Sequence, residues 1–215
     1  MAYVDFEGPA IKDITALHYA NDAGKLPEAY RIFEHLVKES VHVSKEATSF
    51  DRLIELNEEI HRRHLEEGAA LLEGVSPSIL NVQCQPSDAL PKIIEMNGGK
   101  TLKVGTCTDV RSVDYFFKGR GIPYKIASGS KLGVGLDGNL NGKFERYGGG
   151  FAKADSYIPE DGNVIVNSII DGALCKKAHE NKNKVYVVRD EKNPYVLGNI
   201  LIDGLRKEKI PFSIL

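Results

Sequence analysis

From Ser78 to the C-terminus, short β-like runs alternate with helix-like segments, and this alternation constrains the fold more than any other feature. The strand candidates are Ile79–Cys84, Thr101–Thr106, Tyr124–Ala127, the run that ends at Asp155, Val185–Val188 and Phe212–Leu215. The helix candidates between them are Ser87–Met96, Asp109–Lys118, about Val164–Glu180 and about Tyr195–Lys207. Strands that are separated by helices usually pair in parallel, with the helices packed on the sheet. The alternation therefore predicts an α/β class, Rossmann-like, with a mostly parallel sheet and helices on both faces.

The part of the chain before Gly74 has a helical pattern instead. Apolar residues recur at intervals of three and four through Leu26–Ala47 and again through Ser49–Leu72, which indicates two amphipathic helices. We therefore expect an N-terminal helical subdomain over residues 1–75 and a Rossmann-like α/β domain over residues 76–215. The stretch from Gly74 to Ser78 is the expected hinge between them.

One glycine- and asparagine-rich segment, Ser128–Tyr147, lacks helical periodicity and predicts a β-hairpin turning near Asn139–Gly142. Its residues Asp137, Asn139, Asn141 and Gly142 match the opening of a calcium-binding loop. However, Gly148 occupies the position that should carry the bidentate glutamate. A turn built from turn-forming residues is the better interpretation.

Charge and cysteine content limit the classes of partner and compartment. The net charge of −2 and the pI of about 6.3 give no basic field for nucleic acid or an anionic membrane. There is no apolar run long enough to cross a membrane and no signal segment at Met1. The three cysteines lack any C-x-x-C pair, which favours a reducing compartment, so we expect a cytoplasmic protein. His61 and His64 lie three apart among charged residues typical of a solvated face, and no metal site is predicted.

Two residues at the ends of strand candidates are the strongest candidates for chemistry. Asp155 ends the short apolar run that follows the glycines Gly148–Gly150, and Cys84 ends an earlier run. Carboxyl ends of parallel strands meet at one edge of a sheet, so a thiol and a carboxylate would face each other there and could shuttle a proton. The residue types also allow other interpretations. A free cysteine usually packs as a small hydrophobe, and an aspartate in a turn often caps a helix.

Arg111 follows the Thr101–Thr106 strand candidate and is expected at the same edge of the sheet. It would bind a phosphate there, or it would form a surface ion pair with Asp109 or Asp114.

The order of several short motifs, from about Glu58 to Val188, resembles one known family. That family unites methylthioribose-1-phosphate isomerase, ribose-1,5-bisphosphate isomerase and the regulatory subunits of translation initiation factor 2B. The segments that carry the resemblance are Gly68–Leu72, Asn81–Gln85, Thr108–Arg111, Gly121–Pro123, Lys153–Ile158 and Asp161–Asn167. In the isomerases of this family the cysteine matched by Cys84 is catalytic, as is the aspartate matched by Asp155.

The resemblance implies an aldose–ketose isomerase that acts on a small phosphorylated sugar without a cofactor or metal. Cys84 and Asp155 would transfer the protons. Substrate and phosphate binding would fall to Arg111, Gln85, Asn167 and Ser168. The resemblance also implies a homodimer.

Departures from the family's motifs keep other functions open. Gln83, Gln85 and Ser168 replace the family's histidine, asparagine and lysine, and the N-terminal part has no R-G-A motif. These losses favour a non-catalytic regulatory protein that binds a metabolite or nucleotide, like the initiation-factor branch. A third possibility is a different sugar-phosphate enzyme in which the Ser128–Gly150 loop is a lid.

Overall fold

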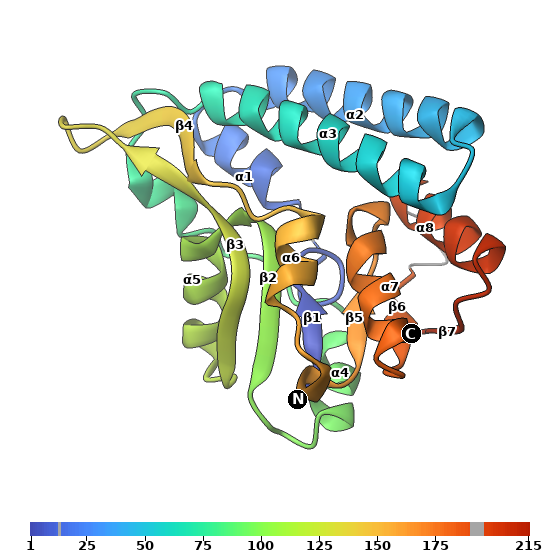
Figure 1. Ribbon diagram of the computed structural model, residues 1–215. Coiled ribbons are helices and arrows are strands. Elements are labelled where there is room, and N and C mark those ends of the chain that lie inside the picture. The colour runs from blue at the N-terminus through green and yellow to red at the C-terminus, as the bar shows by residue number, and fades with distance from the viewer. Residues whose placement is uncertain (13, 190–195) are drawn as a thin grey trace.

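The computed structural model describes residues 1–12, 14–189 and 196–215. These residues form a seven-stranded sheet in the order β4-β3-β2-β1-β5-β6-β7 (Figure 1). Neighbouring strands are parallel except for β3 and β4, which form an antiparallel hairpin at one edge. The strands are β1 Tyr3–Asp5, β2 Leu102–Asp109, β3 Tyr124–Val134, β4 Leu140–Arg146, β5 Val164–Val166, β6 Val185–Val187 and β7 Phe212–Ile214. The predicted α/β class with a mostly parallel sheet is confirmed.

Helices flank the sheet, and two long ones lie across its end. In Figure 1, α2 and α3 run side by side across the top of the molecule, above the carboxyl end of β1. The α-helices are α1 Thr15–Asp22, α2 Leu26–Glu46, α3 Phe50–Ala70, α4 Leu90–Met96, α5 Val110–Arg120, α6 Gly150–Ser156, α7 Gly172–Glu180 and α8 Val196–Lys207. Short 3-10 helices are η1 Pro77–Leu80, η2 Pro159–Asp161 and η3 Ile169–Asp171.

Both faces of the sheet are buried. Alternate residues of one strand point to opposite faces, and in β5 Val164 and Val166 belong to one hydrophobic cluster while Ile165 belongs to the other. The first cluster includes Leu174 of α7, and the second includes Phe116 of α5. The sheet is therefore covered by helices on both sides, as expected for a parallel sheet.

The central strand comes from the N-terminal segment that the sequence pattern marked as helical. Tyr3–Asp5 lies between β2 and β5, with Tyr3 aligned with Lys103 on one side and Val164 on the other. A run of three residues is too short to show a period-two pattern, so this strand has little sequence signal. The helices α1, α2 and α3 follow it. The division of the chain at residue 75 into two domains stays a prediction.

Three predicted elements are wrong. Ile79–Cys84 is not a strand, because the chain forms the 3-10 helix η1 around Pro77 and then continues without regular structure. The run ending at Asp155 is the helix α6, which begins at the last of three consecutive glycines. Glycine is a poor helix former, so these residues mask the helical pattern. The segment from about Val164 was expected to be helical, but its first residues form the strand β5, and α7 starts only at Gly172.

Most other boundaries agree within a few residues. The two long helices were expected over Leu26–Ala47 and Ser49–Leu72, close to the observed α2 and α3. Asp109 caps α5 by accepting a hydrogen bond from the backbone of Arg111. The expected hairpin is β3 and β4. The last predicted helix included Tyr195, which lies outside the described residues, and α8 begins at Val196.

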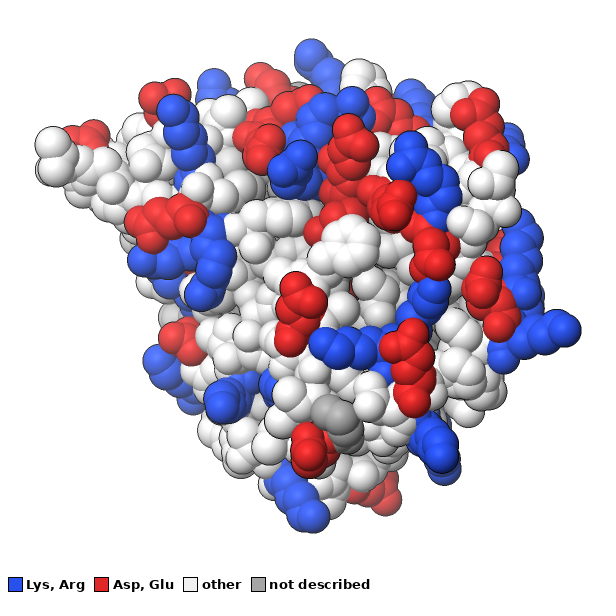
Figure 2. Space-filling model, viewed as in Figure 1, with Lys and Arg blue, Asp and Glu red and all other residues white. Residues whose placement is uncertain are grey.

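The surface shows no segregation of charge on the face drawn in Figure 2, where basic and acidic side chains are interspersed. Among the described residues, no helix combines the length and the apolar character needed to span a bilayer.

Candidate functional site

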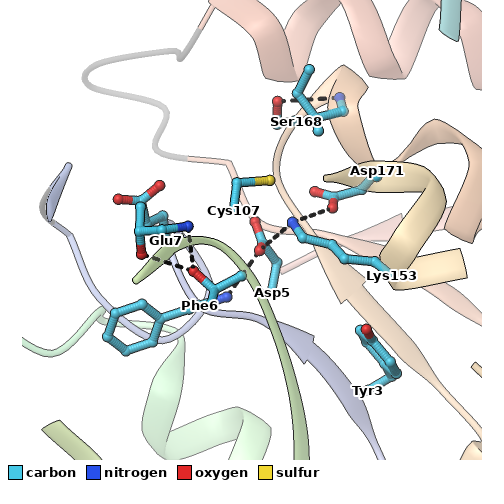
Figure 3. Close-up of polar contacts among 12 residues, drawn as sticks. Tyr3, Asp5, Phe6, Glu7, Cys107, Lys153, Ser168 and Asp171 are labelled. Carbon is cyan, nitrogen blue, oxygen red and sulfur yellow. Dashed lines mark hydrogen bonds and ion pairs between the residues drawn. The ribbon is translucent and has the colours of Figure 1, made fainter. Parts of the chain in front are cut away.

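The carboxyl end of the central strand holds a buried cluster of charged side chains. Asp5 is the last residue of β1, and the Lys153 ammonium donates to Asp5 Oδ1 at 2.7 Å and to Asp171 Oδ1 at 2.8 Å (Figure 3). All three side chains are nearly inaccessible to solvent, at 5% for Asp5, 1% for Lys153 and 0% for Asp171. We refer to these three residues as the Asp5 cluster. Isolated charges are rarely buried in this way, so their mutual contact stabilises the arrangement.

Topology explains why these three residues meet. The parallel register aligns Val4 of β1 with Ile165 of β5, so the segments that follow the two strands begin side by side. Asp171 ends η3, directly after β5. Lys153 comes from α6, which packs closely on η3: a Cβ on Gly150 would lie 1.8 Å from the Ile170 carbonyl oxygen. The glycine at the start of α6 is thus needed for the approach that brings Lys153 to the two aspartates.

A second close approach joins the loops after β1 and β5. Gly8 has a φ of +88°, which favours glycine, and a Cβ there would lie 1.9 Å from Nδ2 of Asn167. The turn after Asp5 therefore packs directly on Asn167. This contact fixes the position of Glu7, whose Oε1 accepts a hydrogen bond from the backbone of Thr15 at 2.8 Å.

Burial controls the protonation of the Asp5 cluster. Burial, and next the charge of Asp171, raise the pKa of Asp5 to about 8, although Lys153 acts in the opposite direction. Burial lowers the pKa of Lys153, but the two carboxylates outweigh it and the pKa stays well above its ordinary value. Burial also raises the pKa of Glu7. Lys153 is therefore charged at neutral pH. Asp5 and Glu7 retain their protons more readily than exposed carboxyl groups do.

Cys107 of β2 lies beside the Asp5 cluster in Figure 3, with its side chain near Asp5. Burial raises the pKa of this thiol well above its ordinary value. A nucleophilic cysteine needs the thiolate form, so Cys107 is a neutral wall of the site and Asp5 is the nucleophile candidate.

The Asp5 cluster opens into a cavity of about 1150 Å³. Asp5, Glu7, Lys153 and Asp171 all line it. Its other walls come from the ends of β1, β2 and β5, and from the helices α1, α2 and α3. A concave site at the carboxyl edge of a parallel sheet is where α/β proteins commonly bind ligands.

The structure does not bring Cys84 and Asp155 together at this cavity. Cys84 is 1% exposed, packs in the cluster that includes Phe116, and is not among the residues lining the cavity. Asp155 is an exposed residue of α6 and does not line the cavity either. The cavity does lie at the carboxyl edge of the sheet, but the charged side chains that line it there come from other positions than Cys84 and Asp155.

Of the residues expected to bind phosphate, Asn167 and Ser168 line the cavity. Arg111 does not line it and is held in an ion pair with Asp109, with Nε donating to Oδ1 and Nη2 to Oδ2, both at 2.7 Å. Gln85 is exposed and likewise lies outside the cavity lining, and its backbone carbonyl accepts from Lys12.

Sequence reasoning missed Asp5, Lys153 and Asp171. The signal at both strand ends is weak, because the apolar runs are only two and three residues long: Tyr-Val before Asp5, and Val-Ile-Val shortly before Asp171. Each is a short apolar run followed by an acidic residue, which is the pattern expected of a buried parallel strand that ends at a site.

Comparisons with known proteins find solved structures with a similar fold. No protein-family model matches the chain, and no curated protein matches it. A phosphoserine phosphatase in complex with substrate shares 17% identity over 99% of this chain and 91% of that chain, with a TM-score of 0.62. A phospho-aspartyl intermediate analogue of phosphoserine phosphatase shares 18% identity over the same fractions, also with a TM-score of 0.62. A HAD family hydrolase from Salmonella enterica subsp. enterica serovar Typhi shares 12% identity over 99% of this chain and 66% of that chain, with a TM-score of 0.65.

These similarities correct the interpretation of the motifs. The resemblance to the isomerase and initiation factor 2B family is wrong, because solved structures that share this fold include phosphoserine phosphatases and a HAD family hydrolase. The assignment as a sugar-phosphate isomerase is wrong for the same reason, and the initiation-factor alternative gains no support. The motif around Asp155, which was central to that resemblance, is part of a helix, whereas the resemblance required Asp155 to end a strand. The expectations of a homodimer and a cytoplasmic location stay predictions.

Proposed function

We propose that the protein is a phosphohydrolase that cleaves a phosphomonoester through a phosphorylated Asp5. The observation that carries this proposal is the buried contact between Asp5 and Lys153 at the open carboxyl end of the central strand. Two structures with this fold support it, since one is a phospho-aspartyl intermediate analogue of phosphoserine phosphatase and the other is a substrate complex of phosphoserine phosphatase. An aspartate serves as a phosphoryl acceptor in enzymes that use covalent catalysis.

In the first step, Asp5 reacts in its ionised form, whose fraction rises as the pH approaches its pKa of about 8, and one carboxylate oxygen attacks phosphorus. Asp5 Oδ1 accepts hydrogen bonds from Lys153 and from the backbone of Phe6, at 2.7 and 3.0 Å, and these contacts hold the carboxylate in place. The bond between phosphorus and the ester oxygen breaks, and its electron pair stays on the leaving oxygen. Glu7 supplies the proton to that oxygen, because it lines the cavity and burial raises the pKa of its carboxyl group, which favours the protonated form.

In the second step, water attacks the phosphorus of phosphorylated Asp5. The Glu7 carboxylate left by the first step takes a proton from this water. The bond between phosphorus and the Asp5 oxygen then breaks, which releases orthophosphate. This step restores the carboxylate of Asp5 and the protonated form of Glu7. Lys153 stays charged throughout and stabilises the negative charge on the transferring group.

The charge balance of the site fits a divalent cation. A phosphate dianion would approach two carboxylates matched by one ammonium group, and Asp171 Oδ2 is buried without a hydrogen-bond partner. Carboxylate oxygens are the ligands that Mg²⁺ prefers, often one or two of them together with substrate phosphate. Among the described residues no group of three or more His, Cys, Asp or Glu side chains could hold a metal ion. Asp5 and Asp171 would therefore hold the cation jointly with the substrate, and the cation would neutralise charge on the phosphate.

The test is phosphate release from p-nitrophenyl phosphate with and without Mg²⁺. The Asp5→Asn variant should lose about 10⁴-fold or more of kcat, the size expected when a nucleophile is removed. The matched control is Asp155→Asn, because Asp155 is an exposed residue of α6 outside the cavity, and it should keep the wild-type rate.

Acid quenching of the wild-type protein during turnover should also reveal one phosphoryl group on the peptide that contains Asp5. Full activity in Asp5→Asn, or a phosphoryl group attached to a different residue, would show that the proposed chemistry is wrong.

A further inference from the structure

The cavity that contains the Asp5 cluster has two chemically different ends. Most of the charged residues that line it lie at the ends of the strands or in the segments that follow them. The others are Lys153 of α6 and, at or near α4, Asp88 and Lys92. The lining residues contributed by α1, α2 and α3 include no Lys, Arg, Asp or Glu within the described chain. We call this uncharged side of the cavity the apolar wall, formed by Leu17, Ile32, Phe33, Leu36, Val37 and Leu65.

The apolar wall follows from the periodicity of α2. Ala29, Ile32, Phe33, Leu36 and Val37 recur at spacings of three and four, so they lie on one face of the helix. That face looks into the cavity instead of closing completely on the sheet. Ile32 and Val37 remain partly exposed, which means that described side chains do not cover them fully.

The histidine that lines the cavity beside the apolar wall, His61, is uncharged as well. His61 lies in the cavity lining and its Nδ1 is 3.1 Å from the hydroxyl of Tyr147. Burial, then the charges of Lys153 and His64, lower the pKa of His61 to about 3, so its ring is neutral at physiological pH. His64 is buried, and its Nδ1 lies 2.8 Å from the backbone oxygen of Ile60. The His61 ring therefore offers no fixed charge for recognising a charged ligand group.

Some charged residues of the lining are already engaged with each other. Lys12 forms an ion pair with Asp88 at 2.8 Å. Asp109 accepts both hydrogen bonds from Arg111. An amino-acid phosphate carries an ammonium and a carboxylate group, and placing these against the apolar wall without partners would cost free energy.

We propose that the substrate is the phosphomonoester of a bulky, uncharged, hydrophobic alcohol, whose apolar body packs on the apolar wall. This inference rests on the proposed phosphohydrolase function and adds the class of leaving group. The volume of about 1150 Å³ exceeds the range of about 300–1,000 Å³ typical of small-molecule pockets. The phosphate would occupy the end at Asp5 and Lys153, and the apolar body would extend toward α2.

A series of n-alkyl phosphates tests this directly, with butyl, hexyl and octyl phosphate compared with phosphoserine below any micelle concentration. Each methylene that becomes buried should raise kcat/KM by up to about four-fold. Phosphoserine should be the poorest substrate of the set. Equal rates for all chain lengths, or a preference for phosphoserine, would overturn the inference while leaving the phosphohydrolase function intact.

Two variants of α2 separate contact with the wall from a general effect on the helix. Ile32→Asn should lower kcat/KM for octyl phosphate by about ten-fold and change butyl phosphate much less, because it removes a contact made only by the longer chain. Tyr30→Asn is the matched control, since Tyr30 is 49% exposed and is absent from the cavity lining. Leu17→Asn on α1 repeats the test from a second helix. Retention of the full chain-length dependence in both wall variants would show that the chain does not bind there.

A binding measurement tests the class of ligand independently of the proposed phosphohydrolase reaction. Calorimetric titration of Asp5→Asn protein with octyl phosphate and with phosphoserine requires no turnover. Tighter binding of octyl phosphate that is weakened by Ile32→Asn, together with a wild-type protein that releases no phosphate from any of these esters, would support the hydrophobic ligand class and reject the proposed reaction. Octyl phosphate binding no tighter than phosphoserine would reject the ligand class whether or not turnover is observed.

Discussion

The Asp5 cluster and the apolar wall face the same cavity but are built by opposite means. The cluster consists of three charged groups, Asp5, Lys153 and Asp171, that are almost completely buried and contact one another. The wall consists of apolar side chains such as Ile32 that remain partly exposed. In most proteins the positions are reversed, with charges in solvent and aliphatic groups in the core.

Buried charges and partly exposed apolar side chains both reduce stability unless something compensates for them, so together they indicate a ligand-binding site. Burying charges is costly, so the Asp5 cluster persists because its members compensate one another and because the sheet fixes their positions. Leaving an apolar helix face uncovered forgoes stabilisation that a packed interface would supply. Both departures from ordinary packing occur around one cavity, which argues that the cavity has a ligand with a charged end and an apolar end.

The largest effect on stability should come from breaking the charge balance of the Asp5 cluster. Lys153→Met would leave two carboxylates buried together without a cation, and we expect it to lower the free energy of unfolding by about 3–5 kcal/mol at pH 7. Urea denaturation measures this change. The penalty should shrink at acidic pH, because protonated carboxyl groups do not need the ammonium group.

Lys176→Met is the matched control on the neighbouring helix α7. Lys176 pairs with Asp51, whose side chain is 66% exposed, so the loss should be below about 1 kcal/mol. A similar loss in both variants would mean that the buried cluster is no more stabilising than a surface ion pair.

A smaller effect should appear in the pH dependence of stability. Burial and the charge of Asp171 raise the pKa of Asp5 from 3.8 to about 8 in the folded protein. Between these values the folded state binds more protons than the unfolded state, so the free energy of unfolding should fall as pH rises from about 4 to 8. Glu7 and Glu58, whose pKa values are also raised by burial, contribute a slope of the same sign.

The contribution of Asp5 is isolated by comparing variants across this pH range with thermal unfolding. Asp5→Asn should flatten the slope relative to the wild type and should be relatively more stable at pH 8 than at pH 5. Asp155→Asn should leave the slope unchanged, because Asp155 is exposed. An unchanged slope in Asp5→Asn would mean that Asp5 titrates at the same pH in the folded and unfolded states.

The two regions were also unequal in what their sequences could predict. The apolar wall lies on α2 and α3, whose periodic stripes gave boundaries within two residues of those observed. Long helices repeat their pattern several times, so the signal accumulates. The pattern does not reveal that part of the stripe faces a cavity, since packed and open apolar faces have the same spacing.

The Asp5 cluster was missed because its elements are short and its contacts are distant in sequence. β1 and β5 have three residues each, and Lys153 lies on a helix that is only seven residues long. Lys153 and Asp5 are 148 positions apart. The local motifs around Asp155 favoured that residue, which lies two positions from Lys153 but is exposed and outside the cavity lining. Only the three-dimensional register of β1 and β5 shows which residues meet.

The smallest expected effect tests whether the apolar wall is open. Ile32→Ala should change the free energy of unfolding by about 0.5 kcal/mol or less, because the described side chains cover Ile32 only in part and alanine is the better helix former. Leu174→Ala is the comparison, since Leu174 is completely buried in α7 and its truncation should cost about 2–5 kcal/mol. Urea denaturation of both variants gives the two values. A loss at Ile32 as large as that at Leu174 would mean that the wall is packed like the core in solution, and the cavity would then be too small for the ligand inferred from it.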